Sequence, residues 1–279
     1  MSNTEQVEYW NGKVGETWAR MQERMDRALT PVTAALLSLA APQPGEDALD
    51  IGCGSGETTL ALAGAVGDDG NATGVDISEP LLARARQRAQ DMLSDADFIN
   101  ADAATHHDEI GYDLIVSRFG VMFFDDPAAA FANIRALAAP GGRLCFACWQ
   151  PPVENGWATF PLTALAALLP TQALSDPHAP GPFAFADPER VHAILAGAGW
   201  SDIVFHAVPF TMVIGEGDEP VGAAVDFNLR IGPAARAIRD AGRDIEPAAR
   251  NILATALAGF AVDGVIGLPG AVWLVSARA

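Results

Sequence analysis

The sequence predicts an α/β protein built on a Rossmann-like parallel sheet with helices on both faces. Short apolar runs alternate with segments of helical periodicity between residues 46 and 149. A glycine-rich turn follows the first of these runs, at the point where a strand would pass into a helix. Half of the 279 residues are hydrophobic, which is enough to fill the interior of one large domain.

The core elements follow from these patterns in chain order. Five short apolar runs are predicted to form strands: 46–52, 71–77, 96–100, 112–117 and 142–149. Three segments with helical spacing lie between them: 58–66, 79–93 and 127–138. Turn signals fall at the boundaries, as in Ser78 followed by Glu79 and Pro80, which opens the second helix.

We interpret the chain as one structural domain with three parts. Residues 1–45 form an N-terminal helical lid, in which Trp18, Met21, Met25 and Leu29 recur at helical spacing. Residues 46–150 form the cofactor-binding core. Residues 151–279 complete the sheet with helical insertions on the substrate side and an antiparallel last strand.

Charge and hydropathy exclude several classes of partner. The formal net charge is -18, and Lys13 is the only lysine, so nucleic acid and anionic membrane surfaces are not expected partners. No apolar run approaches the roughly 20 residues that span a bilayer, and the N-terminus lacks the pattern of a signal peptide. We expect a soluble, cytoplasmic protein; the oligomeric state stays open.

The three cysteines do not predict a disulfide framework or a metal site. Cys145 and Cys148 have a C-x-x-C spacing, but an offset of three in a strand places them on opposite faces. Cys53 lies within the glycine turn with no base identifiable beside it, so we interpret it as a spacer rather than a catalytic thiol. No metal is predicted.

The glycine turn predicts a nucleotide-like ligand. Gly52, Gly54 and Gly56 give G-x-G-x-G, whereas Glu57 stands where a dinucleotide fingerprint has its third glycine. A phosphate beside Asp50 and Glu57 would be repelled, since two like charges about 4 Å apart cost about 4 kcal/mol at an effective dielectric constant of 20. A cationic adenosyl ligand would be attracted. Asp76 ends the second strand, where an acid can accept ribose hydroxyls.

The core resembles the class I S-adenosylmethionine-dependent methyltransferases. The resemblance is carried by five ordered motifs: LDIGCGSG, GVDIS, NADA, YDLIVSRFGVMFF and LAAPGGRLCFACW. Within that family, SRFGVMFFDDP and the N-terminal YWNG are most similar to small-molecule enzymes of the ubiquinone/menaquinone methyltransferase type. The implied cofactor is S-adenosyl-L-methionine, and the implied partner is a small methyl acceptor.

The resemblance also implies roles for individual residues. It places Asp50 and the backbone of Gly52, Cys53 and Gly54 at the methionine portion, and it counts Gly56 among the cofactor-binding residues. Asp76 and Ile77 would contact the ribose and the adenine edge, while Asp102 and Ala103 would contact the adenine. Ser117 and Arg118 would border the sulfonium. Each acid has a plainer alternative, such as a turn cap or a solvated loop residue.

The acceptor side is predicted from residues at the carboxyl ends of the strands, where open α/β sheets bind ligands. Methyl transfer mainly requires alignment and exclusion of water, so a general base is optional and the catalytic residues are left open. His106, His107 and Arg118 are the candidates. Trp10 and Trp18 are expected to contact the cofactor or to pack in the lid. The predicted acceptor pocket contains Tyr9, Met21, Phe119, Met122, Trp149 and Trp157.

Three functions remain in competition at this point. The first is methyl transfer to a small, partly apolar acceptor at oxygen, carbon or nitrogen. The second is a nicotinamide-dependent oxidoreductase, which Asp50 and Glu57 disfavour. The third is a non-catalytic adenosyl-binding subunit, which would bind the cofactor without turnover.

Overall fold

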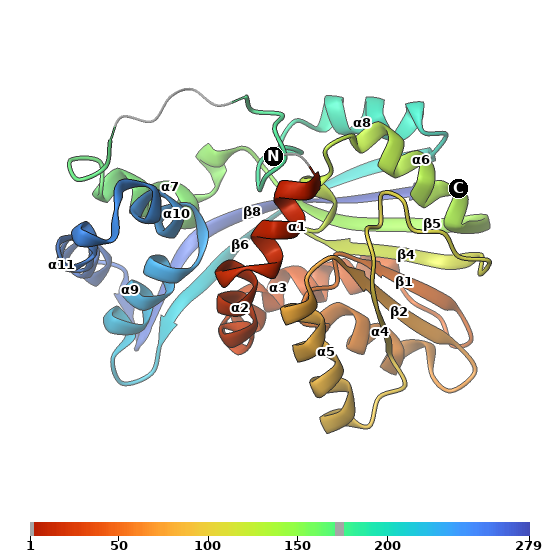
Figure 1. Cartoon of the computed structure of the whole chain (residues 1–279), viewed down its shortest axis with the longest axis horizontal. Helices are drawn as coiled ribbons and strands as arrows, with labels where there is room; N and C mark the ends of the chain where they lie inside the picture. The colour runs from red at the N-terminus through yellow and green to blue at the C-terminus, as the bar shows by residue number, and fades with distance from the viewer. Residues whose placement is uncertain (1–2, 171–175) are drawn as a thin grey trace.

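A computed structural model describes residues 3–170 and 176–279 of the chain (Figure 1). Its sheet has eight strands in the order β3-β2-β1-β4-β5-β8-β6, with β7 paired to β8. The strands of the parallel half are β1 Asp47–Ile51, β2 Asn71–Asp76, β3 Asp97–Asn100, β4 Tyr112–Arg118 and β5 Ala138–Trp149. The predicted fold class is confirmed, and each predicted core strand overlaps an observed one.

The register of the central strands determines where the site forms. In β1, Asp50 lies opposite Gly74 of β2 and Val116 of β4, and all three strands run parallel. Their carboxyl ends therefore lie at one edge of the sheet. The turns after β1, β2 and β4 meet at that edge.

Helices cover both faces of the sheet (Figure 1). Three of them lie on one face: α3 Gln22–Ala40, α4 Glu57–Val66 and α5 Glu79–Met92. Two lie on the other: α6 Pro127–Leu137 and α8 Pro188–Gly197. Asp126 and Asp187 cap α6 and α8, each accepting a hydrogen bond from a main-chain N–H of the first turn. The buried core runs through both layers and includes Phe131, Phe146 and Phe185.

The N-terminal lid is three helices rather than one continuous helix. They are α1 Asn3–Asn11, α2 Lys13–Arg20 and α3. Gly12 has an extended backbone and separates the first two, and a turn at Met21 separates α2 from α3. The chain therefore folds back over the carboxyl edge of the sheet, with α1 and α2 in front of it (Figure 1).

The last part of the chain adds the antiparallel strands, as predicted. The long strands β6 Ser201–Glu216 and β8 Val265–Arg278 pair with each other, and β8 also pairs antiparallel with β5. They extend past the parallel strands toward a group of helices (Figure 1). That group contains α7 Gly156–Ala164, α9 Pro220–Arg230, α10 Gly232–Ala241 and α11 Glu246–Ala258. The two-residue strand β7 Ala261–Val262 is an addition that the sequence did not predict.

Two further properties concern the whole of the described chain. Cys53, Cys145 and Cys148 are buried free thiols. Burial raises the pKa of the Cys145 thiol to about 11, which keeps it protonated at neutral pH. Across residues 3–170 and 176–279, no helix combines the length and the apolar character that crossing a membrane requires.

Candidate cofactor and acceptor site

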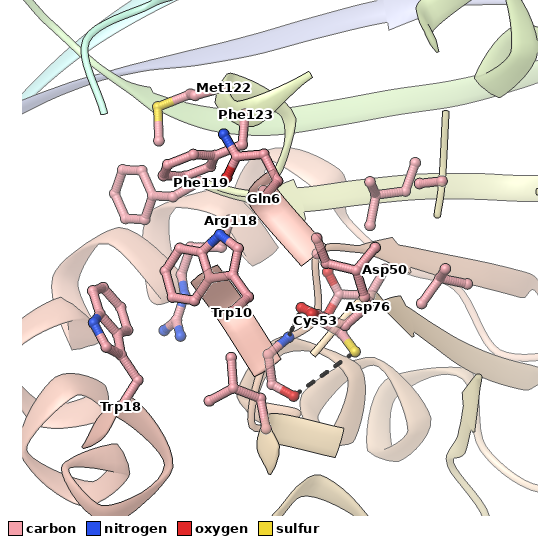
Figure 2. A pocket seen from close by; sticks show the side chains of 18 of the residues that line it. Gln6, Trp10, Trp18, Asp50, Cys53, Asp76, Arg118, Phe119, Met122 and Phe123 are labelled. Carbon is pink, nitrogen blue, oxygen red and sulfur yellow. Dashed lines mark hydrogen bonds between the residues drawn. The ribbon is translucent and has the colours of Figure 1, made fainter. Parts of the chain in front are cut away.

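A cavity of about 460 Å³ lies at the carboxyl ends of β1, β2 and β4. Its walls come from the lid, from the turns after these strands, and from the C-terminal part of the chain. Figure 2 shows Asp50, Cys53 and Asp76 grouped on one side of the pocket, with Trp10 and Arg118 nearer its middle and Phe119, Met122 and Phe123 on another side. The cavity therefore has an acidic region and an aromatic region.

The main-chain N–H groups of the glycine turn are already used within the protein. Gly52 and Cys53 both donate to the carbonyl of Val75, at 2.8 and 3.2 Å. Gly54 donates to Asp76 Oδ2 at 2.8 Å, and Gly56 donates to the carbonyl of Cys53 at 2.9 Å. A ligand at this turn would consequently meet few free donors, in contrast to a phosphate-binding loop.

Two of the glycines are required by the backbone itself. Gly52 has a φ of 65°, and a Cβ there would lie 2.6 Å from the Cα of Gly120, so the turns after β1 and β4 approach each other closely. Gly54 has a φ of 55°, a left-handed conformation that side chains rarely adopt. Gly56 lies outside the cavity lining, and a Cβ there would lie 2.9 Å from the Phe98 ring.

Asp76 organises the acidic region from the end of β2. Its Oδ2 accepts from the Gly54 N–H, and its Oδ1 accepts from the Ser78 N–H at 2.8 Å. Burial raises the pKa of this carboxyl, although these hydrogen bonds oppose the shift. Because each carboxylate oxygen can accept more than one hydrogen bond, Asp76 can still receive a ligand hydroxyl. Asp76 and Ile77 both line the cavity.

Asp50 is a buried carboxyl with one oxygen unpartnered. It is 1% exposed and lines the cavity. Oδ2 accepts from Thr59 Oγ1 at 2.7 Å, whereas Oδ1 has no hydrogen-bond partner among residues 3–170 and 176–279. Burial raises the pKa of Asp50 to about 7, against the lowering effects of the Thr59 hydrogen bond and of the Arg118 charge. A cationic or hydrogen-bond-donating ligand group would satisfy this oxygen.

Arg118 lies at the end of β4, and its guanidinium is already paired within a cluster of charged side chains. Its Nη1 pairs with Glu57 and donates to Thr33 Oγ1 at 2.7 Å, and its Nη2 lies 3.9 Å from Asp26. Arg88 contacts the same Asp26 at 2.9 Å. Burial raises the pKa of Glu57, and the Arg118 charge opposes this. The cluster joins the lid helix α3 to α4, α5 and β4.

The turn after β3 forms another wall of the cavity. Asp102 and Ala103, the residues expected to contact an adenine, line it. Asp102 Oδ1 accepts from the Ala104 N–H at 2.9 Å, which fixes the turn. The side chain of Asn133 donates to the carbonyls of Ala103 and His106, at 3.1 and 2.9 Å, and holds this turn against α6.

The aromatic region combines residues from four distant segments. Trp10 makes edge-to-face contacts with Trp18 and Phe123, with ring centroids 5.4 and 5.7 Å apart. Phe119 stacks on Trp149 at 4.4 Å with the rings 9° from parallel. Phe119 also has a φ of 70°, a strained conformation for a residue with a Cβ. Met122 and Trp157 complete this side of the cavity.

Several residues proposed from the sequence lie away from the cavity. Ser117 is buried, donating to the Ile51 carbonyl at 2.7 Å and accepting from the Gly120 N–H, so it ties β4 to β1. Met21 packs in the core. Tyr9 packs against Trp10 outside the lining. His106 and His107 are also outside it; His106 Nε2 lies 3.9 Å from Asp108.

The sequence did not single out several residues that line the cavity. They are Gln6, Gln22, Asp26, Pro182, Met212, Ile231 and Gly232. The last two join α9 to α10, which brings the helical insertion to the edge of the cavity. None of these positions belongs to a recognisable motif, because only the packing of distant segments brings them together. Within the described residues, no group of three or more His, Cys, Asp or Glu side chains could hold a metal.

Comparisons with known proteins agree with this geometry. Residues 48–142 match the family described as methyltransferase domain. These residues form a domain of the class I S-adenosylmethionine-dependent methyltransferase type. The match covers the strands and turns that form the acidic region of the cavity.

Two curated relatives are similar to part of this chain. Nocamycin O-methyltransferase from Saccharothrix syringae is 31% identical over 183 residues, which are 62% of this chain and 65% of that one. Demethylmenaquinone methyltransferase from Bacillus mycoides is 33% identical over 112 residues, 39% of this chain and 47% of that one. The chain thus spans less than two thirds of the length of these relatives.

A solved structure shares the fold of this chain. Magnesium protoporphyrin IX methyltransferase from Synechocystis PCC 6803, solved with bound SAH, aligns with a TM-score of 0.54 and 20% identity. The alignment covers 76% of this chain and 93% of that one. At this identity, the likeness concerns the fold alone.

Proposed function

We propose that the protein transfers the methyl group of S-adenosyl-L-methionine to a small, partly apolar acceptor at oxygen, carbon or nitrogen. The single observation that carries the proposal is the chemistry of the turn after β1. Its main-chain N–H groups already donate hydrogen bonds within the protein, and buried carboxyls face the cavity beside it. This arrangement suits a cationic nucleoside and repels a diphosphate.

The residues present fit this cofactor. The unpartnered Asp50 Oδ1 would accept from its ammonium group, and the carboxylate of Asp76 would accept from its ribose. Asp102, Ala103 and Ile77 line the space where an adenine would lie. When bound, the cofactor supplies a methyl group activated by a positively charged sulfur.

The chain itself would supply alignment and exclusion of water. Trp10 and Trp18 cover the cavity from the lid, and their ring faces would attract a cation. Phe119, Trp149 and Trp157 present an apolar surface to an acceptor. With His106 and His107 outside the lining, we propose that positioning carries the reaction and that neither histidine acts as a general base.

Calorimetric titration with S-adenosyl-L-methionine tests the cofactor assignment. We expect saturable binding by the intact protein and a loss of at least about 30-fold in affinity for Asp76→Ala, since two or more hydrogen bonds to a charged group are removed. Asp97→Ala, an exposed change on β3, is the matched control and should bind normally. Unchanged binding by Asp76→Ala contradicts the assignment.

Two further measurements separate this proposal from its alternatives. Reduced nicotinamide dinucleotide should produce no saturable fluorescence change, because the main-chain N–H groups of the turn after β1 already donate within the protein and are not free to bind its phosphates. The curated relatives are named for nocamycin and demethylmenaquinone methylation, which supports small organic acceptors as the panel for assays with a labelled methyl group. Cofactor binding without transfer to any member would favour the non-catalytic alternative.

A further inference from the structure

Gln6 in α1 has a buried hydrogen-bond donor without a partner. The residue is 3% exposed and lines the cavity, and its Nε2 contacts no acceptor in the described part of the chain. Leaving a buried donor unpaired costs about 1–3 kcal/mol. The donor is therefore positioned for a ligand atom rather than for stability.

The position of Gln6 along α1 places it away from the ribose side. Asn11, at the end of the same helix, is hydrogen-bonded to the Ile77 carbonyl at the end of β2. Gln6 lies five residues earlier, which is about 7 Å along the helix axis. Trp10, one turn after Gln6 on the same helix face, contacts Phe123. Gln6 thus extends toward the aromatic region.

The surroundings of Gln6 indicate what kind of molecule would meet it. Figure 2 shows its side chain near the labelled aromatic residues Phe119, Phe123 and Trp10. Phe119 and Trp149 form a stacked pair in the same cavity wall. Aromatic faces of this kind favour flat, unsaturated ligands, and an amide N–H needs an oxygen or nitrogen acceptor.

We propose that Gln6 is a specificity-determining residue that donates a hydrogen bond to an oxygen of the methyl acceptor. The acceptor class is a flat, unsaturated molecule with a carbonyl, enolate or phenolate oxygen. This inference rests on the proposed function only in calling the ligand a methyl acceptor. The oxygen of such a ligand would accept a hydrogen bond from Gln6 Nε2. A hydrocarbon of the same shape would leave this donor without a partner.

Two isosteric probes test the proposal by equilibrium dialysis. They are 2-acetylnaphthalene, which has a carbonyl, and 2-isopropenylnaphthalene, in which a methylene group replaces that oxygen. We expect the wild type to prefer the ketone by about tenfold in Kd. Gln6→Met keeps the side-chain length without the donor and should reduce the preference below about twofold. Gln90→Met, on the exposed face of α5, should retain it.

The cofactor side is measured separately with S-adenosylhomocysteine, on the same variants. We expect its Kd to change by less than about twofold in Gln6→Met. The inference is overturned if the wild type shows no ketone preference or no probe binding, or if Gln6→Met keeps the preference. If Gln6→Met binds S-adenosylhomocysteine more weakly but keeps the ketone preference, Gln6 contacts the cofactor rather than the acceptor. Absence of S-adenosylhomocysteine binding by the wild type would contradict the proposed function instead.

Discussion

The side chain of Asn11 donates a hydrogen bond from Nδ2 to the main-chain oxygen of Ile77, at 2.8 Å. Its Oδ1 accepts from the Glu79 N–H at 3.0 Å, so one amide bridges both sides of the turn after β2. Ser78 Oγ, in the same turn, donates to the Trp10 carbonyl at 2.7 Å. These bonds attach the end of α1 to the turn that follows Asp76, the proposed ribose contact.

Loss of this attachment should weaken cofactor binding more than it weakens the fold. Asn11→Ala removes the two hydrogen bonds to the turn after β2, worth about 0.5–1.5 kcal/mol each, and a third within α1 to the Val7 carbonyl. We expect a rise of about 3- to 10-fold in the Kd for S-adenosyl-L-methionine. Amide hydrogen exchange in α1 should accelerate. Asn251→Ala, on the exposed side of α11, serves as the control and should change neither quantity. If Asn11→Ala has the same Kd for S-adenosyl-L-methionine and the same exchange rates in α1 as the wild type, other contacts hold the lid.

Gly15 should tolerate no side chain, although it lies within a helix. An added Cβ would be 1.9 Å from the Trp10 carbonyl oxygen and 3.0 Å from Ser78 Oγ. The clash should outweigh the helix-propensity gain of about 1 kcal/mol for alanine, so Gly15→Ala should lower the free energy of unfolding in urea. Gly64→Ala is the matched control: nothing lies within 4 Å of its added Cβ in α4, and we expect it to stabilise the protein. Equal stability of the two variants would contradict the packing argument.

Titration of Asp50 should couple cofactor binding to pH. Its pKa is raised from 3.8 to about 7 by burial, so the folded protein without ligand holds a proton there that the unfolded chain releases. The contribution of Asp50 to the free energy of unfolding therefore falls as pH rises from about 4 to 7, and levels off above that.

Binding of the cationic cofactor should release the proton from Asp50. We expect the affinity for S-adenosyl-L-methionine to rise by about tenfold from pH 6 to pH 8, with proton release detected by calorimetry in buffers of different ionisation enthalpy. Asp50→Asn has no titrating carboxyl and should lose most of this slope. A slope that is the same in Asp50→Asn would assign the proton to another group.

Arg118 should contribute to stability through the charge cluster. Its side chain and those of Asp26 and Glu57 are only 15–18% exposed. Arg118→Met therefore leaves the mostly buried Glu57 carboxyl without its cation, while Asp26 keeps Arg88 as its partner. We expect a loss of about 2–4 kcal/mol in the free energy of unfolding at pH 7.5. Adding Glu57→Gln should recover part of it. The exposed Arg20→Met, whose side chain is 67% exposed, should cost under about 0.5 kcal/mol. If Arg118→Met also costs under about 0.5 kcal/mol, the cluster has no structural role.

The sequence alone determined the parallel core and the position of its ligand edge. Periods of about two and 3.6 residues are local properties, and they mark strands and helices wherever one face is buried. Asp50 and Asp76 follow from this directly, because each lies at or next to the end of a strand whose neighbours run parallel. The sequence also predicts a preference for a cationic ligand from Asp50 and Glu57.

Only the tertiary structure decided how the individual groups are used. The main-chain N–H groups of Gly52, Cys53 and Gly54 donate hydrogen bonds to β2, and Arg118 pairs with Glu57. These partners are distant in the chain and come within bonding distance only in the folded protein. Gln6 enters the cavity for the same reason, through the seating of α1 on the turn after β2. Such contacts join residues dozens of positions apart, and a local pattern carries no information about which distant side chain will occupy a given site.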